Sequence, residues 1–325
     1  MLTGKEAIFG LWYKRKGSST SHKVNPVIDE SSAEEFNIVP LLIKRIDDST
    51  LLKRGGGLIS DKKVLIIGCG SVGSDLLFLL SRSGLKNFTI VDNDKLSVEN
   101  TYKHFLGMDK SLMSNFKVSL LKKELENRYP NIQINAVESE ILSAIKNDKI
   151  NFNDYDLIIV AIGNPNVERK LNELIHETNT PAIFTWAEAY GLGGHALMTN
   201  NKGSGCYECL INKKDLSFSS SFAGKSDVPF IKNLNGCAGS YTPYGSMDSM
   251  ETALKAPRLA MRYIQNQVSG NPLLSWKGSD KSFLEEGFET SDRYKNVPFE
   301  TLYHDNYDYI DPECKICSKH VEVNL

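Results

Sequence analysis

Four of the six cysteines fall into two Cys-x-x-Cys pairs, Cys206 with Cys209 and Cys314 with Cys317. Together the pairs offer four soft thiolate ligands, the set that a closed tetrahedral zinc site uses. Because the pairs lie far apart in the sequence, a shared Zn²⁺ would tie the C-terminal part of the chain back to the body of the domain. A redox disulfide and two unrelated surface turns are the alternatives. We expect structural zinc.

A glycine loop gives a second chemical signal. Residues 68–73 read Gly-Cys-Gly-Ser-Val-Gly, the G-x-G-x-x-G spacing, and follow a β-branched apolar run at 63–67. Such glycines allow a tight turn and close backbone approach, and the next helix presents N–H groups to phosphate. Asp92, at the end of the next predicted strand, can accept from ribose hydroxyls. The loop predicts a nucleotide site; the alternative is a turn that only packs helix on sheet. Cys69 is interpreted as a small buried thiol.

Apolar runs and helical patterns alternate along the chain around this loop. The predicted strands lie at 63–67, 87–92, 132–137, 155–162 and 181–186, and the predicted helices at 74–83, 116–129, 167–177 and 247–268. Buried parallel strands read as continuous apolar runs and are joined by crossover helices. Gly84 is suited to a left-handed helix cap. The pattern predicts an α/β, Rossmann-like domain with a mostly parallel central sheet and helices on both faces.

The chain divides near residue 50. Residues 1–50 include the low-complexity run 17–21 and are interpreted as a linker or the edge of a preceding region. Residues 51–325 form the predicted main domain. Within it, residues 213–244 are rich in Ser, Gly and Asn. That length is unusual for a structureless connection, so we expect a lid or binding loop.

Charge and hydropathy exclude several classes of protein. The 325 residues carry 38 Lys plus Arg against 40 Asp plus Glu, a net charge of −2, so no bulk positive field attracts nucleic acid or an anionic membrane. The most apolar long stretch is interrupted by glycines, and no basic end followed by an apolar run marks a secretory signal. We expect a cytoplasmic protein that binds neither nucleic acid nor membranes.

The residues from Asp92 onward carry a family resemblance. Residues 92–107 read DNDKLSVENTYKHFLG, and residues 109–125 read DKSLMSNFKVSLLKKEL. This pattern resembles the ubiquitin-activating enzyme superfamily in its bacterial ThiF, MoeB and HesA branch, over roughly residues 50–317. The matching positions are Asp92, Asp94, Asn100, Lys103, His104 and Lys117. The resemblance implies an enzyme that uses ATP and Mg²⁺ to adenylate the C-terminal carboxylate of a ubiquitin-like or similar small protein.

The resemblance also implies roles for individual residues. Attack on an α-phosphate needs fixed cations to offset phosphate charge, a task that suits Lys117 and Lys103. Arg54 would reach the neighbouring subunit's ATP site in a homodimer, and the zinc site would be structural. The predicted nucleotide-binding residues are Gly68, Gly70, Ser71, Gly73, Asp92, Asp94, Asn100, Lys103, Lys117 and Asn164.

Two departures from the family pattern concern this site. Lys103 stands where arginine is usual, so the charge is kept but the planar fork for bidentate phosphate contact is lost. Residues 161–164 read Ala-Ile-Gly-Asn, where the family has Ala-Thr-Asp with a magnesium-binding aspartate. Asn164 and Asp94 are the remaining candidate magnesium ligands.

Cys237 lies outside both cysteine pairs, in a glycine-containing stretch. A thiolate there could attack an acyl-adenylate, release AMP and hold the acyl group as a thioester for a conjugating enzyme. No His or Lys adjacent in sequence lowers its pKa, and a buried structural cysteine is the alternative. The segment resembles the active-site loop of bacterial antiphage conjugation enzymes, the CBASS ubiquitin-transferase-like and BilD-type proteins. Residues 211–246 are therefore the predicted crossover loop, and the stretch 167–172 resembles the same branch.

Three other functions remain open from the sequence. A sulfur-carrier adenylyltransferase of the thiamin or molybdopterin type would not need Cys237. An NAD-dependent oxidoreductase would share the glycine loop. A nucleotide-binding scaffold without activity would account for the missing aspartate after Ala161.

Overall fold

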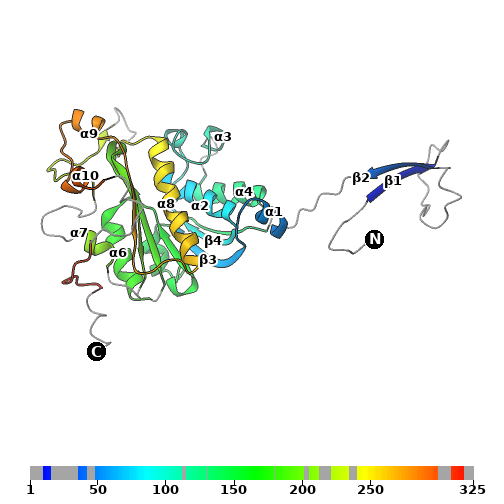
Figure 1. Ribbon diagram of the computed structural model, residues 1–325, viewed down its shortest axis with the longest axis horizontal. Coiled ribbons are helices and arrows are strands. Elements are labelled where there is room, and N and C mark those ends of the chain that lie inside the picture. The colour runs from blue at the N-terminus through cyan, green and yellow to red at the C-terminus, as the bar shows by residue number, and fades with distance from the viewer. Residues whose placement is uncertain are drawn as a thin grey trace. The chain divides into compact units, whose positions relative to one another are not determined.

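The computed structural model describes residues 10–15, 36–41, 48–111, 115–129, 131–178, 180–200, 205–211, 221–233, 240–298 and 309–317 (Figure 1). The chain forms two units, residues 1–55 and 56–325. Within the described ranges, no helix combines the length and the apolar character that crossing a membrane requires.

The first unit contains a pair of antiparallel strands and a short helix. Strand β1 (Gly10–Arg15) pairs with β2 (Phe36–Leu41), in register from Gly10 opposite Leu41 to Arg15 opposite Phe36. Helix α1 (Asp48–Arg54) follows. This pairing was not predicted, because a polar, low-complexity run separates the two short apolar segments and such a run is more typical of a linker.

A seven-stranded sheet organises the second unit, in the order β11-β8-β7-β6-β3-β4-β5. Its strands are β3 (Ser60–Ile67), β4 (Leu85–Val91), β5 (Gln133–Val137), β6 (Leu157–Val160), β7 (Ala182–Ala187), β8 (Gly193–Thr199) and β11 (Leu273–Lys277). Strands β5, β4, β3, β6 and β7 are parallel, and β8 and β11 are antiparallel to their neighbours. The predicted fold class, an α/β domain with a mostly parallel sheet, is confirmed.

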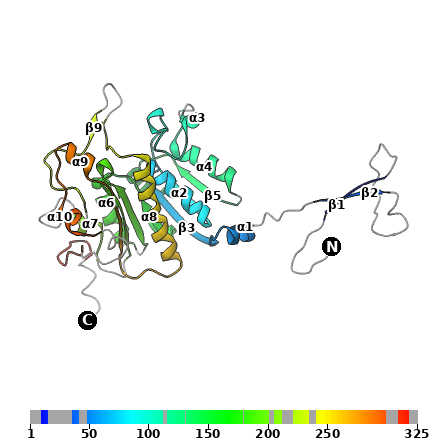
Figure 2. The same ribbon diagram turned by 45° about the horizontal axis from the view of Figure 1, so that its top comes forward.

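Helices cover both faces of this sheet. Helices α2 (Ser71–Ser83), α4 (Lys117–Arg128) and α8 (Ser246–Ile264) pack on the face that carries Val64 and Ile66. Helices α5 (Ile141–Lys146), α6 (Pro165–His176) and α7 (Tyr207–Ile211) pack on the face that carries Leu65 and Ile67. Figure 2 shows α2 and α8 side by side, in agreement with their extensive contact.

Short elements complete the described chain. They are η2 (Val98–Asn100), α3 (Met108–Ser111), η3 (Phe152–Asp154), η4 (Ala189–Gly191), β9 (Lys232–Asn233), β10 (Ser240–Tyr241), α9 (Lys281–Glu285) and α10 (Asp292–Asn296). The left-handed cap predicted at Gly84 is confirmed: its φ is +106°, and its N–H faces the carbonyls of Leu80 and Ser81.

The strand register fixes where the site lies. Ile67 at the end of β3 stands opposite Val91 of β4 and Val160 of β6. The residues that follow these strands, Gly68, Asp92 and Ala161, therefore leave the sheet together at its carboxyl edge. In parallel sheets this edge is where ligands bind.

Candidate functional site

The three loop glycines meet different surroundings. Gly68 has φ +91°, and a Cβ there would lie 2.6 Å from the carbonyl oxygen of Ala161. A Cβ on Gly73 would collide with the carbonyl of Gly68. At Gly70, by contrast, a Cβ would have no described atom within 4 Å. Packing thus requires Gly68 and Gly73, whereas Gly70 leaves space for a ligand beside the backbone.

Asp92 connects the second strand end to the loop. Its Oδ2 accepts from the backbone N–H of Cys69 at 2.7 Å, and its Oδ1 accepts from the N–H of Asp94 at 2.8 Å. A carboxylate can accept about four hydrogen bonds, so Asp92 keeps capacity for a ribose hydroxyl. Its predicted role in ribose binding stays a prediction.

Lys117 lies at the start of α4 and faces the same edge. Its backbone N–H donates to the carbonyl of Asp94 at 2.9 Å, and its Nζ donates to Asp94 Oδ2 at 2.7 Å. The Lys117 side chain is 8% exposed and that of Asp94 is 61% exposed. A buried ammonium needs an anionic partner, and here that partner is an exposed carboxylate. Another anion can therefore replace Asp94 beside Lys117, and a cation can replace Lys117 beside Asp94.

A first cavity of about 310 Å³ opens beside these groups. Its volume is in the lower range of small-molecule sites. It is lined by Ile67, Gly68, Gly70, Val91, Asp92, Asn93, Asp94, Lys117, Ser139, Glu140, Ile141, Ala161, Ile162, Asn164 and Val167. The structure therefore brings six of the predicted nucleotide-binding residues around one space.

A second cavity, of about 320 Å³, adjoins the first. Gly70, Ala161 and Ile162 line both spaces and so form their shared wall. The other lining residues are Ser71, Val72, Glu99, Asn100, Lys103, His104, Gly163, Thr185, Trp186, Ala187, Tyr241, Thr242 and Tyr244. Ser71, Asn100 and Lys103, predicted to bind nucleotide, thus lie around this second space.

Two tyrosines of the second cavity were not foreseen. The Lys103 Nζ lies 4.3 Å from the ring centroid of Tyr244 and 5.7 Å from that of Tyr241, in cation–π geometry. Tyr244 Oη and Ser71 Oγ are hydrogen-bonded at 2.8 Å. Burial lowers the pKa of Lys103, and the nearby carboxylate of Asp248 opposes this shift. The sequence signal for both tyrosines was their place inside the predicted crossover loop, residues 211–246.

His104 and Cys69 support the loop from inside. The His104 Nδ1 accepts from the N–H of Leu106 at 3.1 Å, so its Nε2 carries the proton and donates to the carbonyl of Cys69 at 2.9 Å. Burial lowers the pKa of His104 to about 4. Burial also raises the pKa of the Cys69 thiol, in agreement with its interpretation as a structural residue.

The two asparagines predicted to bind nucleotide, Asn164 and Asn100, serve as local caps. Asn164 Oδ1 accepts from the N–H groups of Asn166 at 3.2 Å and Val167 at 3.4 Å and so caps α6. Asn100 Oδ1 accepts from the N–H of Ser97 at 3.0 Å. Metal binding by Asn164 would compete with its cap, so the exposed carboxylate of Asp94 is the better placed of the two predicted magnesium ligands.

The four paired cysteines converge and are all buried. Their sulfurs lie within 4.8 Å of one another. The separations are 3.9 Å for Cys206–Cys209, 3.7 Å for Cys206–Cys314 and 3.5 Å for Cys209–Cys317. A tetrahedral ion with metal–sulfur bonds of about 2.3 Å places its sulfurs about 3.8 Å apart. The thiol positions therefore fit a Zn²⁺ ion.

The two other predicted catalytic residues are Cys237 and Arg54. Cys237 lies outside the described residues. Arg54 is exposed at the end of α1, in the first unit. Their roles stay predictions.

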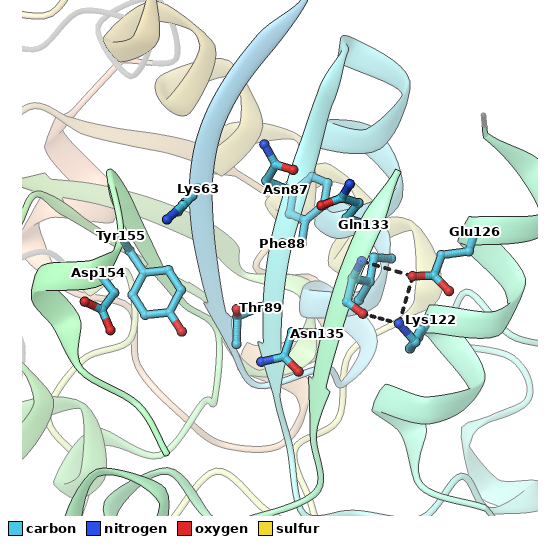
Figure 3. A pocket seen from close by; sticks show the side chains of 11 residues that line it. Lys63, Asn87, Phe88, Thr89, Lys122, Glu126, Gln133, Asn135, Asp154 and Tyr155 are labelled. Carbon is cyan, nitrogen blue, oxygen red and sulfur yellow. Dashed lines mark hydrogen bonds and ion pairs between the residues drawn. The ribbon is translucent and has the colours of Figure 1, made fainter. Parts of the chain in front are cut away.

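A larger hollow of about 580 Å³ lies near the amino ends of β3, β4 and β5, at the other end of these strands from the glycine loop (Figure 3). Its two α4 side chains are already engaged at the edge strand. Glu126 Oε1 accepts from the N–H of Ile134 at 3.1 Å, and Lys122 Nζ donates to the carbonyl of Ile134. Lys122 and Glu126 also form an ion pair with each other, with 2.8 Å between Nζ and Oε1. The two side chains thus satisfy backbone groups on the free edge of β5, a role that suits edge protection better than catalysis.

Comparison with known proteins identifies the family of this chain. The ThiF family model matches residues 50–247. The chain belongs to the ThiF family. This confirms the superfamily predicted from the residues that follow the glycine loop.

Individual relatives agree with this membership. The chain is 27% identical to the ATP-dependent ubiquitin transferase-like protein Cap2 of Vibrio cholerae over 266 residues, 72% of this chain and 41% of that protein. It is 26% identical to the sulfur carrier protein ThiS adenylyltransferase of Escherichia coli over 166 residues, 51% of this chain and 63% of that protein. The chain spans half or less of the two Cap2 relatives that it matches.

Solved structures show the same fold. The crystal structure of E. coli MccB with AMPCPP and MccA matches with a TM-score of 0.56 at 17% identity, over 83% of this chain and 70% of that one. At 17% sequence identity, this similarity shows a shared fold.

Proposed function

We propose that this chain is an ATP-dependent adenylyltransferase that activates the C-terminal carboxylate of a ubiquitin-like or other small protein. The observation that carries the proposal is the pair of adjoining cavities, which share Gly70, Ala161 and Ile162 as a wall at the carboxyl edge of the sheet. Joining a carboxylate to an α-phosphate needs two such neighbouring sites. Membership of the ThiF family and the likeness to a ThiS adenylyltransferase support the same chemistry.

In this proposal ATP occupies the first cavity and its phosphates reach past Gly70 toward Ser71, Asn100 and Lys103 of the second cavity, where the acyl chain end also lies. A carboxylate oxygen forms a bond to the α-phosphorus, and the bond from that phosphorus to the α–β bridging oxygen breaks. The electron pair leaves with pyrophosphate, and an acyl-adenylate remains. Because negative charge develops on the transferred and departing groups, Lys117 turns from Asp94 toward the phosphates, and the N-terminus of α2 stabilises them through its N–H groups.

Asp94, released from Lys117, is the proposed holder of Mg²⁺, which would neutralise phosphate charge. Its donor type suits this hard cation, and its exposed carboxylate lies at the rim of the first cavity. The four cysteines are the proposed ligands of a structural Zn²⁺. Their role is to join the segment 309–317 to α7.

The proposal continues with a thioester on Cys237. Its thiolate attacks the acyl carbonyl, AMP leaves, and the acyl group passes to the thiol of a conjugating enzyme. Tyr241, four residues further along the chain than Cys237, lines the second cavity, and this closeness in sequence supports the thioester step. We further propose an antiphage conjugation role in the cytoplasm and a homodimer in which Arg54 contributes to the neighbouring site; the likeness to the Cap2 proteins supports the conjugation role.

A sulfur-carrier adenylyltransferase is the second candidate function, because a ThiS adenylyltransferase is among the relatives. In that case the acyl-adenylate would pass to a sulfur donor and end as a thiocarboxylate, and Cys237 would be dispensable.

The experiment measures ATP–pyrophosphate exchange with small proteins encoded beside this chain, followed by mass spectrometry of the enzyme. Exchange together with a thiol-sensitive adduct that Cys237→Ala abolishes is expected. An adduct that persists in Cys237→Ala would remove the thioester step. A thiocarboxylate on the carrier would favour the second candidate, and tight NAD binding without exchange would overturn both.

A further inference from the structure

A buried carboxylate on α6 joins two parts of the molecule that the proposed function keeps separate. Glu168 is 1% exposed. Its Oε1 accepts from the backbone N–H of Gly163 at 2.9 Å, and its other oxygen, Oε2, accepts from the hydroxyl of Tyr207. Tyr207 lies between Cys206 and Cys209, inside the first cysteine pair. Glu168 therefore bridges the cysteine cluster and the segment 161–164.

The segment 161–164 separates the two cavities. Its Ala161 and Ile162 line both spaces, Gly163 lines the second and Asn164 lines the first. Gly163 has φ +71°, a left-handed conformation that few residue types adopt. Because the N–H of Gly163 donates to Glu168, the conformation of the segment 161–164 depends on the position of that carboxylate.

Tyr207 has a second connection to the same site. Its ring stacks on Phe184 of β7 with the centroids 4.8 Å apart, and it meets Trp186 edge-on at 5.7 Å. Trp186 lines the second cavity. Tyr207 is thus connected to the site by two routes, one through Trp186 of the sheet and one through Glu168, which accepts from Gly163.

Two further residues of α6, Arg169 and Asn172, hold this helix against the first cysteine pair. Arg169 forms a bidentate ion pair with Glu208, with separations of 2.9 and 2.5 Å. Asn172 Oδ1 accepts from the N–H of Tyr207 at 3.3 Å, and its Nδ2 lies 3.6 Å from Cys206 Sγ. The stretch 167–172, which the sequence singled out by resemblance, therefore fixes α7 against α6.

We propose that Glu168 is a positioning residue for adenylation: it holds the segment 161–164 between the two cavities, and Tyr207 transmits the order of the cysteine cluster to it. This inference rests on the proposed function for the identity of the reaction. The four thiols fit a zinc ion, so loss of that ion would release Tyr207 and loosen the wall between nucleotide and acyl group. Misalignment by about 1 Å can cost about 100-fold in rate.

Matched variants separate positioning from folding. Glu168→Gln keeps an acceptor for Gly163 and a polar partner for Tyr207, Glu168→Leu removes both, and Tyr207→Phe removes only the hydroxyl. Glu173→Gln, an exposed change on the same helix, is the control. Each variant is measured for zinc content, affinity for ATP, kcat of ATP–pyrophosphate exchange, and amide hydrogen exchange over 161–164.

With zinc retained, Tyr207→Phe and Glu168→Leu are expected to lower kcat about tenfold or more, with ATP affinity within about threefold. Amide exchange over 161–164 should accelerate in both. Glu168→Gln and Glu173→Gln should match the wild type. Wild-type kcat and amide protection in both damaging variants would overturn the proposal.

A readout on the unaltered chain covers the case in which a variant fails to fold. Removing zinc from the wild type with a chelator should accelerate amide exchange over 161–164 whether or not the enzyme turns over. Unchanged exchange there would contradict the coupling. Absence of ATP binding in the wild type, with the coupling intact, would instead refute the proposed function alone.

Discussion

The Nζ of Lys117 lies 2.7 Å from Oδ2 of Asp94, with the lysine side chain 8% exposed and the aspartate side chain 61% exposed. A nearly buried cation is therefore neutralised by a carboxylate that solvent reaches. The pair keeps the ammonium in place at the first cavity and leaves its anionic partner replaceable by phosphate. A metal ion taken up by Asp94 would free the lysine at the same moment, which links metal binding to charge stabilisation.

Replacing Lys117 by alanine should abolish most activity. We expect ATP–pyrophosphate exchange to fall by about 100-fold or more, because a fixed charge that stabilises the transition state is lost. Lys123→Ala, an exposed change on the same helix, is the control and should leave exchange unchanged. Equal exchange rates in the two variants would show that Lys117 has no role in catalysis.

The buried His104 predicts a dependence of stability on pH. Its pKa is lowered by burial from 6.5 to about 4, so the unfolded chain takes up the proton at a higher pH than the folded chain. The stabilisation is complete above about pH 6.5 and is lost as the pH falls toward 4. Between pH 7 and pH 5 this group should lower the free energy of unfolding by about 2 kcal/mol.

Urea unfolding of the wild type and of His104→Gln at both pH values measures this contribution. Glutamine can donate to the Cys69 carbonyl but does not titrate in this range, so the variant should lose less stability on acidification. The same loss in both proteins would assign the pH dependence to other groups.

Gly70 and Gly68 should respond differently to alanine. Gly70→Ala meets no described atom within 4 Å and is expected to fold with nearly wild-type stability, but its methyl group would obstruct a ligand at the shared wall. Gly68→Ala combines φ +91° with a clash on the Ala161 carbonyl and should lose about 2 kcal/mol or more. Thermal unfolding and ATP titration separate the two effects. Unimpaired ATP binding by Gly70→Ala would argue against a nucleotide beside it.

Local sequence was enough to predict the elements that bear the glycine loop. Apolar runs and a glycine stop determine strands such as β3 and helices such as α2 over a few residues. Contacts between distant segments gave no such signal: Tyr244 and Ser71, which meet at the second cavity, are 173 residues apart. Only the fold shows that Lys103 lies against two tyrosine rings and not among the residues around the first cavity.

The helix caps were harder to predict than the helices. The N-cap of α8 is Gly245 and not the serine directly before the predicted helix at 247–268, although serine is a common capping residue. The carboxylate of Asp248, three residues along the chain, accepts from the N–H of Gly245 at 2.6 Å.

Cysteine substitution should separate the cluster from the loop thiol. We expect Cys314→Ser to bind no zinc and to unfold at a lower temperature, because an ion held by all four thiols would tie residues 309–317 to α7 and its binding free energy would add to stability. Cys69→Ala removes a cysteine that is equally buried but outside the cluster, so it should retain one zinc per chain. Metal analysis and thermal unfolding of both variants test this. Full zinc content in Cys314→Ser would show that the four thiols do not share an ion.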